Sequence, residues 1–281
     1  YSSNNVVCCN TVSNNSYYGI NLALLSSDNT IYRNNFNNTE QVWGVSTNIW
    51  NHTDEGNYWS DYTGQDLNGD GIGDDPYYID ENNQDNRPLM GVFSAFDFTW
   101  KGGKYNATIV SNSTIRDFNF QIGTETGNKI IRFNATGADG SVGFSRVTMP
   151  AELMKHPYVV LVDDMEIAPT LLNISDVANV CLYFTYFHKN YTIKIISSEA
   201  LHLYYELLAK YLGLQEHLYN LNATYYALLN NYTRLQEDVY NLNDTCSDLL
   251  INHIKLQIDL YTLRIDLSYL NETYYGLLTN Y

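Results

Sequence analysis

The residues best suited to chemistry lie in an acidic, glycine-rich run that begins at Asp66. Asp, Asn and Asp stand at the first, third and fifth positions of this run, with Gly at the sixth and Asp at the ninth. This is the pattern at the start of a calcium-binding loop, and oxygen ligands favour a hard cation. The predicted ligands are the side chains of Asp66, Asn68, Asp70 and Asp74 and the carbonyl of Ile72.

The run departs from an EF-hand loop at its twelfth position, where Tyr77 replaces the expected glutamate. Asp75 or Asp80 could complete the ligand shell. A calcium ion here would be structural, because it would stiffen a loop whose carboxylates otherwise repel one another. The alternative is a turn of Asn, Asp and Gly residues that holds no metal.

Other reactive residues form no catalytic set. The acids between residues 54 and 85 lie in Gly- and Asn-rich loops, where carboxylates usually bind metal or face solvent. The six histidines have no metal-site spacing. The four cysteines show neither a zinc pattern nor a disulfide framework; they are Cys8, Cys9, Cys181 and Cys246. We therefore expect a protein that is not an enzyme.

The aromatic residues Tyr58, Trp59 and Tyr62 precede the acidic run. Their rings could stack on sugars. The interpretation we favour is instead that they cap the open end of a β structure by packing on its last layer.

Composition excludes several partner classes. There are 31 acidic and 15 basic side chains, and the net charge is −16. Nucleic acids and anionic membranes bind clustered Lys and Arg, so neither is an expected partner. The longest apolar runs fall short of the roughly 18 residues that a membrane span needs. We expect an internal piece or processed form of a longer, exported chain.

Acceptor sequences for N-linked glycans are unusually frequent. Chance would give roughly five Asn-x-Ser/Thr sequons in a chain of this composition. The sequence has twelve, at Asn14, Asn37, Asn51, Asn106, Asn112, Asn134, Asn173, Asn190, Asn222, Asn231, Asn243 and Asn271. This excess predicts N-linked glycans and an extracellular, cell-surface location.

The elements that position these residues are recognisable, and the C-terminal one is the clearest. Leucine recurs every seven residues at Leu207, Leu214, Leu221, Leu228, Leu235, Leu242, Leu249, Leu256, Leu263, Leu270 and Leu277. These are the d positions of a heptad whose a positions include Tyr204, Cys246 and His253, and the pattern predicts a left-handed coiled coil. The apolar a and d positions must be covered by other helices, so we expect a homo-oligomer. Apolar residues at b and e favour a trimer over a dimer or tetramer.

The first 40 residues contain a 24-residue repeat. Ser3, Asn5, Val7, Asn10 and Val12 recur as Ser27, Asn29, Ile31, Asn34 and Phe36. Short β segments with Asn at fixed turns are typical of a parallel β-helix. Only about two coils are present, so we expect a truncated end of such a helix.

Residues 92–199 predict an all-β domain. Eight short alternating segments lie between turns of Gly, Asn and Asp. They are residues 93–100, 105–111, 116–122, 129–134, 142–148, 158–162, 180–187 and 191–196. This number of strands favours a β-sandwich of immunoglobulin-like type.

The predicted fold class is therefore mainly β plus a long α-helix. Residues 1–91 form β-helix coils and a cap with the calcium-type loop, residues 92–199 form the sandwich, and residues 200–281 form the coiled-coil stalk.

Together these features resemble cell-surface proteins of archaea. The Asn-rich repeat, residues 56–62, the acidic run and residues 87–90 look like the end of a NosD-type right-handed β-helix. Residues 131–186 look like the β-sandwich that often follows it, and the heptad tail is similar to a spacer that lifts such heads from the membrane. The resemblance implies a secreted, glycosylated surface-layer or adhesin-like component.

Three functions compete on this basis. The first is a structural surface-layer or filament subunit that assembles with itself and with other surface-layer proteins. The second is an adhesin or carbohydrate-binding head on an oligomeric stalk. The third is a viral fibre, against which the dense glycan acceptors weigh.

Overall fold

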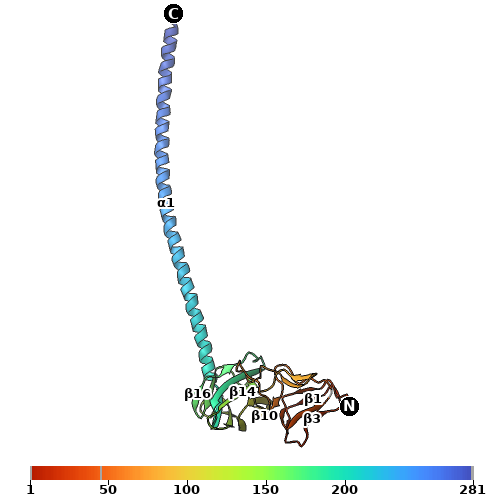
Figure 1. Cartoon of the computed structure of the whole chain (residues 1–281). Coiled ribbons are helices and arrows are strands. Elements are labelled where there is room, and N and C mark those ends of the chain that lie inside the picture. Colours follow the sequence, from red (N-terminus) through yellow and green to blue (C-terminus); the bar gives the residue numbers. More distant parts are fainter. Residues whose placement is uncertain (1, 45, 280–281) are drawn as a thin grey trace. The chain divides into compact units, whose positions relative to one another are not determined.

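The computed structural model describes residues 2–44 and 46–279 (Figure 1). The chain is mainly β with one long C-terminal helix, which confirms the predicted fold class at this level. It divides into two units, residues 1–206 and residues 207–281. Residues 280 and 281 of the predicted stalk lie outside the described residues.

The N-terminal part is built from very short strands. They are β1 (Val6–Cys8), β2 (Thr11–Ser13), β3 (Tyr18–Leu22), β4 (Thr30–Tyr32), β5 (Asn35–Asn37), β6 (Glu40–Gly44), β7 (Tyr58–Trp59), β8 (Tyr77–Asp80) and β9 (Asn83–Asp85). Strands of successive turns pair in parallel: β1 with β4, β2 with β5 and then β7, and β3 with β6. Val7 pairs with Ile31 and Val12 with Phe36, so the predicted 24-residue repeat is confirmed.

Asparagine ladders hold these turns together. The Nδ2 atom of Asn10 donates to Oδ1 of Asn34 at 2.9 Å, and Nδ2 of Asn34 donates to Oδ1 of Asn57 at 3.0 Å. The main-chain N–H of Asn57 then donates to Oδ2 of Asp85 at 2.6 Å. A carboxylate only accepts hydrogen bonds, so Asp85 ends the ladder without needing a further acceptor.

An aromatic stack closes this part of the fold. The Trp59 ring is buried and lies 4.6 Å from the Phe36 ring and 4.3 Å from the Tyr77 ring, measured between centroids. Trp59 is therefore a cap residue, as we expected, and its faces are covered by protein rings.

The next part contains longer strands in two sheets. The strands are β10 (Val92–Trp100), β11 (Gly103–Ser111), β12 (Thr114–Ile122), β13 (Lys129–Thr136), β14 (Val142–Pro150), β15 (Tyr158–Val162), β16 (Met165–Ile167), β17 (Thr170–Leu171), β18 (Asn179–Phe187) and β19 (Asn190–Ser197). One antiparallel sheet has the order β10-β11-β14-β18-β17, and the other has the order β12-β13-β19-β15-β16. All eight predicted strands are present, whereas β16 and β17 are too short to show a sequence pattern.

One hydrophobic core is shared by the two sheets. It draws Ile109, Val147 and Leu182 from the first sheet and Phe133 and Ile193 from the second, all of them fully buried. Apolar side chains at alternate positions of each strand meet there, as the period of two requires.

The helix α1 runs from Glu199 to Thr279, two residues after β19 ends (Figure 1). Its 81 residues contain no proline, and at 1.5 Å per residue the helix is about 120 Å long. Among residues 2–44 and 46–279, no helix is both long enough and apolar enough to cross a membrane.

Candidate functional site

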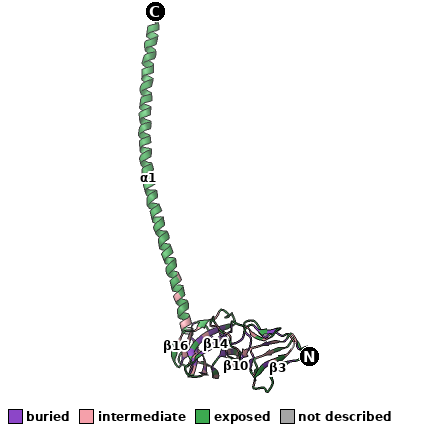
Figure 2. Cartoon of the chain, in the orientation of Figure 1, coloured by how far each residue is buried: buried purple, intermediate pink, exposed green. Residues whose placement is uncertain are grey.

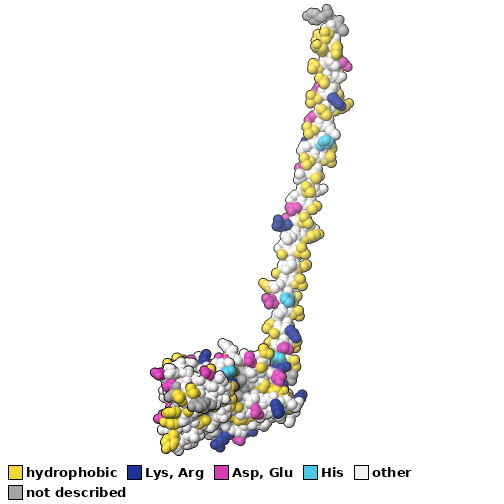
Figure 3. Space-filling model, turned by 90° about the vertical axis from the view of Figure 1, so that its right-hand side faces the viewer, with side chains coloured by type: hydrophobic (Ala, Val, Ile, Leu, Met, Phe, Trp, Pro, Cys, Tyr) yellow, Lys and Arg dark blue, Asp and Glu magenta, His cyan; other side chains and the backbone are white. Residues whose placement is uncertain are grey.

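The most extensive unusual surface is the apolar stripe of α1. The eleven d-position leucines from Leu207 to Leu277 are each 61–68% exposed. Figure 2 shows that α1 is coloured as exposed along nearly its whole length. Hydrophobic side chains continue along the helix in Figure 3. We call the a and d residues of this helix the seam. Within the described residues it is a solvated apolar face, and such faces mark interaction sites.

The seam follows a longer period that the heptad prediction overlooked. The segment from Tyr204 to Thr224 recurs, at 21 residues or three heptads, in the segment from Tyr225 to Thr245. In both segments Gln at an e position donates its Nε2 hydrogen to a Tyr hydroxyl at the preceding a position. The Gln215–Tyr211 and Gln236–Tyr232 bonds are 2.9 and 3.0 Å long. In any interface formed by the seam, the hydroxyl oxygens of these tyrosines would therefore already accept a hydrogen bond from their own helix.

The acidic loop forms a tight network with the main chain. Asp66 accepts hydrogen bonds from the N–H groups of Gly69, Asp70 and Gly71 at 2.8–3.1 Å. Gly69 and Gly71 have φ values of +68° and +83°, a conformation that favours glycine. Ile72 is buried and anchors the loop in a small apolar cluster.

The remaining predicted ligands lie in the same loop. Oδ1 of Asp70 accepts from the N–H of Ile72 at 2.8 Å, and Oδ2 of Asp74 accepts from the N–H of Leu67 at 2.6 Å. Asp80 instead accepts from Asn82 and Asn83. Across the described residues, no three His, Cys, Asp or Glu side chains gather as a metal site would require. The calcium loop stays a prediction.

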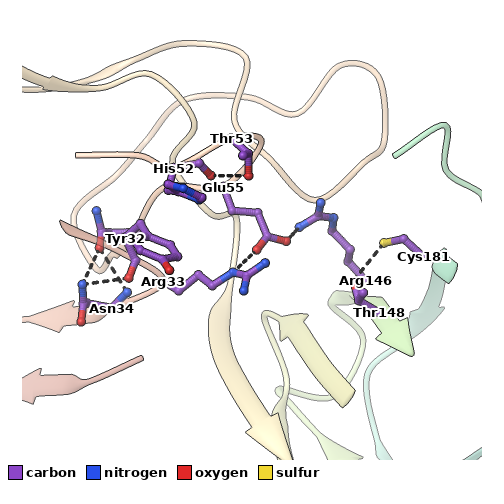
Figure 4. A network of polar contacts seen from close by, with 10 residues as sticks. Tyr32, Arg33, Asn34, His52, Thr53, Glu55, Arg146, Thr148 and Cys181 are labelled. Carbon is purple, nitrogen blue, oxygen red and sulfur yellow. Dashed lines mark hydrogen bonds and ion pairs between the residues drawn. The ribbon is translucent and has the colours of Figure 1, made fainter. Parts of the chain in front are cut away.

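A buried ion-pair network lies where the N-terminal turns meet the first antiparallel sheet (Figure 4). The carboxylate of Glu55 pairs with Arg33, which follows β4, and with Arg146 of β14. Glu55 and Arg146 are 5% and 2% exposed. Buried charges at this depth cost several kcal/mol unless they are paired.

The same arginine links the network to the acidic loop. A Cβ atom on Gly71 would lie 3.0 Å from Cδ of Arg146, so glycine leaves room for the arginine side chain. Nε of Arg146 is buried and has no hydrogen-bond partner among the described residues. Sequence reasoning missed this network, although one arginine in the otherwise apolar and small-residue strand β14 was a signal.

Asp85 is a second buried acid. Burial raises the pKa of its carboxyl from 3.8 to about 6, while hydrogen bonds from Asn57, Arg87 and Trp59 act in the opposite direction. The shift reflects the cost of a charge in a buried position.

A histidine cluster was also missed. Nε2 of His188 lies 2.7 Å from Oγ of Ser113, and its Nδ1 lies 2.7 Å from Oγ of Ser141. The Ser–His distance matches a nucleophile and its base. However, a Cβ on Gly137 or Gly143 would lie within 2.6 Å of the ring, so the protein packs closely against both sides. The two hydrogen bonds connect the ends of strands, and His188 is only 7% exposed.

The predicted glycan acceptors are all at least partly exposed, whereas the buried asparagines lie outside sequons. None of the twelve sequon residues is buried, and only Asn51 and Asn134 are partly covered. The buried asparagines are outside sequons; they are Asn29, Asn34, Asn35, Asn48, Asn57 and Asn83. Three acceptors have Nδ2 bonded within the protein: Asn106 to Asp97, Asn112 to the Val142 carbonyl, and Asn134 to Asp117.

Comparison with known proteins agrees with the N-terminal architecture. Residues 1–64 match the family described as periplasmic copper-binding protein (NosD). A curated relative, the probable ABC transporter binding protein NosD of Stutzerimonas stutzeri, is 44% identical over 80 residues. That stretch covers 26% of this chain and 18% of the relative, so less than a fifth of the relative is spanned. No solved structure matches the chain significantly. The two matches, with the parallel strand pairing, support a NosD-type β-helix at residues 1–64.

Proposed function

We propose that this protein is a structural, N-glycosylated surface component that assembles with copies of itself through α1. In this proposal residues 1–91 are the capped end of a parallel β-helix, residues 92–199 an immunoglobulin-like sandwich, and residues 200–281 a coiled-coil stalk. The assembly is a surface layer or filament of the archaeal type named above.

The exposed seam carries the proposal. Burying a leucine contributes about 1.5–3 kcal/mol, and bringing two proteins together costs about 4–15 kcal/mol. Eleven leucines on each of two helices outweigh that cost even when they are only partly covered. A second copy of the same helix supplies matching residues at every heptad.

The tyrosines at a positions fit the same conclusion. A buried hydroxyl without a partner costs about 1–3 kcal/mol. The Gln215 and Gln236 side chains lower this cost for Tyr211 and Tyr232, because each donates a hydrogen bond to the hydroxyl oxygen before a partner arrives. Bulky a residues and apolar residues at b, such as Tyr219 and Tyr240, favour three helices over two.

The distribution of asparagines supports glycosylation. Acceptors in sequons must reach the glycosylating enzyme, and all twelve are at least partly exposed. Asn10, Asn34 and Asn57 of the ladder lie outside sequons, so glycans on the acceptors would not replace ladder hydrogen bonds. The matching family is described as periplasmic and the curated relative as a probable ABC transporter binding protein, which is consistent with an extracellular or periplasmic location.

The proposed function includes a calcium ion but no copper ion. Calcium at the Asp66–Asp74 loop remains part of it, with a structural role. Copper takes nitrogen and sulfur ligands, and the described residues hold no group of three His, Cys, Asp or Glu side chains suited to a metal ion. The part of the chain that the structure describes therefore offers no such set of ligands for copper, and we propose no copper site.

Sedimentation of two matched variants tests the assembly. Leu235→Asp with Leu242→Asp places charges in the seam, whereas Ala227→Asp with Asn241→Asp places the same residue type at c positions on the opposite face. We expect the wild-type protein and the c-position variant to sediment as oligomers at micromolar concentration and the seam variant as a monomer. A folded wild-type monomer would refute the proposal.

A further inference from the structure

An exposed aromatic surface lies on the paired strands β3 and β6. The Tyr18 and Trp43 rings lie 6.0 Å apart between centroids and are tilted by 38°. Trp43 is 43% exposed, Tyr18 38% and the neighbouring Tyr17 80%. We call these three residues the aromatic platform.

The exposure of Trp43 differs from that of the other tryptophans. Trp50 and Trp59 are each 1% exposed, and Trp100 is packed against the core of the two sheets. Tryptophan offers a large apolar area, so leaving it in water forgoes a large stabilisation. Trp59, the sugar-stacking candidate in the sequence, is covered by Phe36 and Tyr77 and has no face left for a ligand.

Polar side chains stand beside the platform. In the strand register Glu40 is the partner of Tyr18, and Asn21 is the partner of Trp43. Both Glu40 and Asn21 are exposed. Within the described residues, neither side chain forms a hydrogen bond or ion pair, although the Glu40 charge lies near enough to Tyr77 to help raise the pKa of that hydroxyl. A carboxylate acceptor and an amide donor and acceptor are therefore available.

This combination selects a ligand class. A pyranose ring has one apolar C–H face and a rim of hydroxyl groups. An indole ring can cover the C–H face, while a carboxylate and an amide can bind the hydroxyls. The Glu40 charge and the net charge of −16 disfavour an anionic ligand.

We propose that the aromatic platform is a binding site for a neutral oligosaccharide, with one sugar ring stacked on Trp43 and its hydroxyls bonded by Glu40 and Asn21. The site lies entirely within residues 17–43 and does not depend on self-assembly through α1. It gives the chain a recognition surface in addition to its proposed structural role.

A glycan array followed by titration tests this site. The unglycosylated full-length protein is applied to immobilised neutral and charged glycans, and the strongest neutral binder is titrated while tryptophan fluorescence is recorded. We expect saturable binding that protects Trp43 from acrylamide quenching. Trp43→Ala should weaken the binding at least tenfold, and Trp43→Phe should weaken it less.

The matched control is Tyr78→Ala, because Tyr78 is a 71% exposed aromatic residue of β8 outside the platform. Its variant should bind as the wild type does, and circular dichroism should show that all variants are folded. A blank array, preference for charged glycans, or equal binding by Trp43→Ala would overturn the proposal. So would a Trp43→Ala variant that alters only sedimentation, because the platform would then be a protein contact.

Discussion

Glu55 shows how a single buried residue can decide whether two parts of a fold stay joined. Its carboxylate faces one guanidinium from the N-terminal turns and one from β14, so it compensates charges on both sides (Figure 4). Removing one member of a buried pair leaves an uncompensated charge and typically costs about 3–5 kcal/mol. Arg33 and Arg146 would then also repel each other, because both side chains are positively charged.

We therefore expect Glu55→Gln to lower the free energy of unfolding by about 3–5 kcal/mol, as measured by urea denaturation. Asp164→Asn is the matched control, because it removes the carboxylate of the Lys194–Asp164 pair, whose acid is 75% exposed. Exposed pairs contribute about 0–1 kcal/mol. Equal losses in the two variants would contradict the role assigned to Glu55.

Asp85 predicts a pH dependence with a defined sign. The pKa of its carboxyl is about 6 in the folded protein and near 3.8 in the unfolded chain. Between these values the folded protein holds a proton that the unfolded chain lacks, so stability rises as the pH falls from 6 to 4 and is lost as the pH rises through 6. The slope is at most about 1.4 kcal/mol per pH unit.

Asp85→Asn isolates this contribution. The amide does not titrate, so the difference in free energy of unfolding between wild type and variant should change between pH 7 and pH 4.5. Wild type should gain relative to the variant at the lower pH. Urea denaturation at four pH values measures this, and a pH-independent difference would show that Asp85 stays ionised.

For the helices and strands, local periods in the sequence predicted the structure, whereas contacts between residues far apart in the sequence could not be predicted. The 24-residue period predicted which residues of β1 and β4 pair, because each turn repeats the same Asn and apolar positions. The seven-residue period likewise predicted α1. By contrast, Arg146 and Glu55 are 91 residues apart, and no local period connects them.

The same limit applies to aromatic residues. The sequence does not distinguish Trp43 from Trp59. Only the fold shows that Phe36 and Tyr77 cover Trp59, whereas Trp43 stays exposed. The acidic loop was readable as a loop because its turns require glycine at positive φ. Whether its oxygens bind an ion depends on side-chain positions that the pattern does not determine.

The calcium prediction belongs to this loop. Adding calcium after treatment with a chelator should raise the melting temperature, since a ligand that binds only the folded state stabilises it. Asn68→Ala should reduce this rise, because it removes a predicted ligand; among the described residues, the Asn68 side chain forms a hydrogen bond only with Asp70, so its removal disturbs little else. Asn82→Ala, in an exposed turn elsewhere, is the control. A melting temperature unchanged by chelation would show that the loop holds no calcium.

For the whole molecule, the central question is how copies of α1 align. Most helical stability in proteins comes from packing of an apolar face, and the d leucines of this face are 61–68% exposed. In a parallel, in-register assembly each a residue meets its own copy. In an antiparallel assembly each a residue meets a d leucine instead.

Cys246 distinguishes these arrangements, because it is exposed and occupies an a position. In a background where the other cysteines are replaced (Cys8→Ser, Cys9→Ser and Cys181→Ala), oxidised glutathione should convert the assembly to covalent dimers that a reductant separates. Parallel alignment brings the two thiols together, and disulfide exchange then joins them. Ala223→Cys combined with Cys246→Ser moves the thiol to an outer f position and should cross-link far more slowly. If sedimentation shows oligomers but Cys246 does not cross-link, the helices run antiparallel or out of register, and the parallel stalk is wrong.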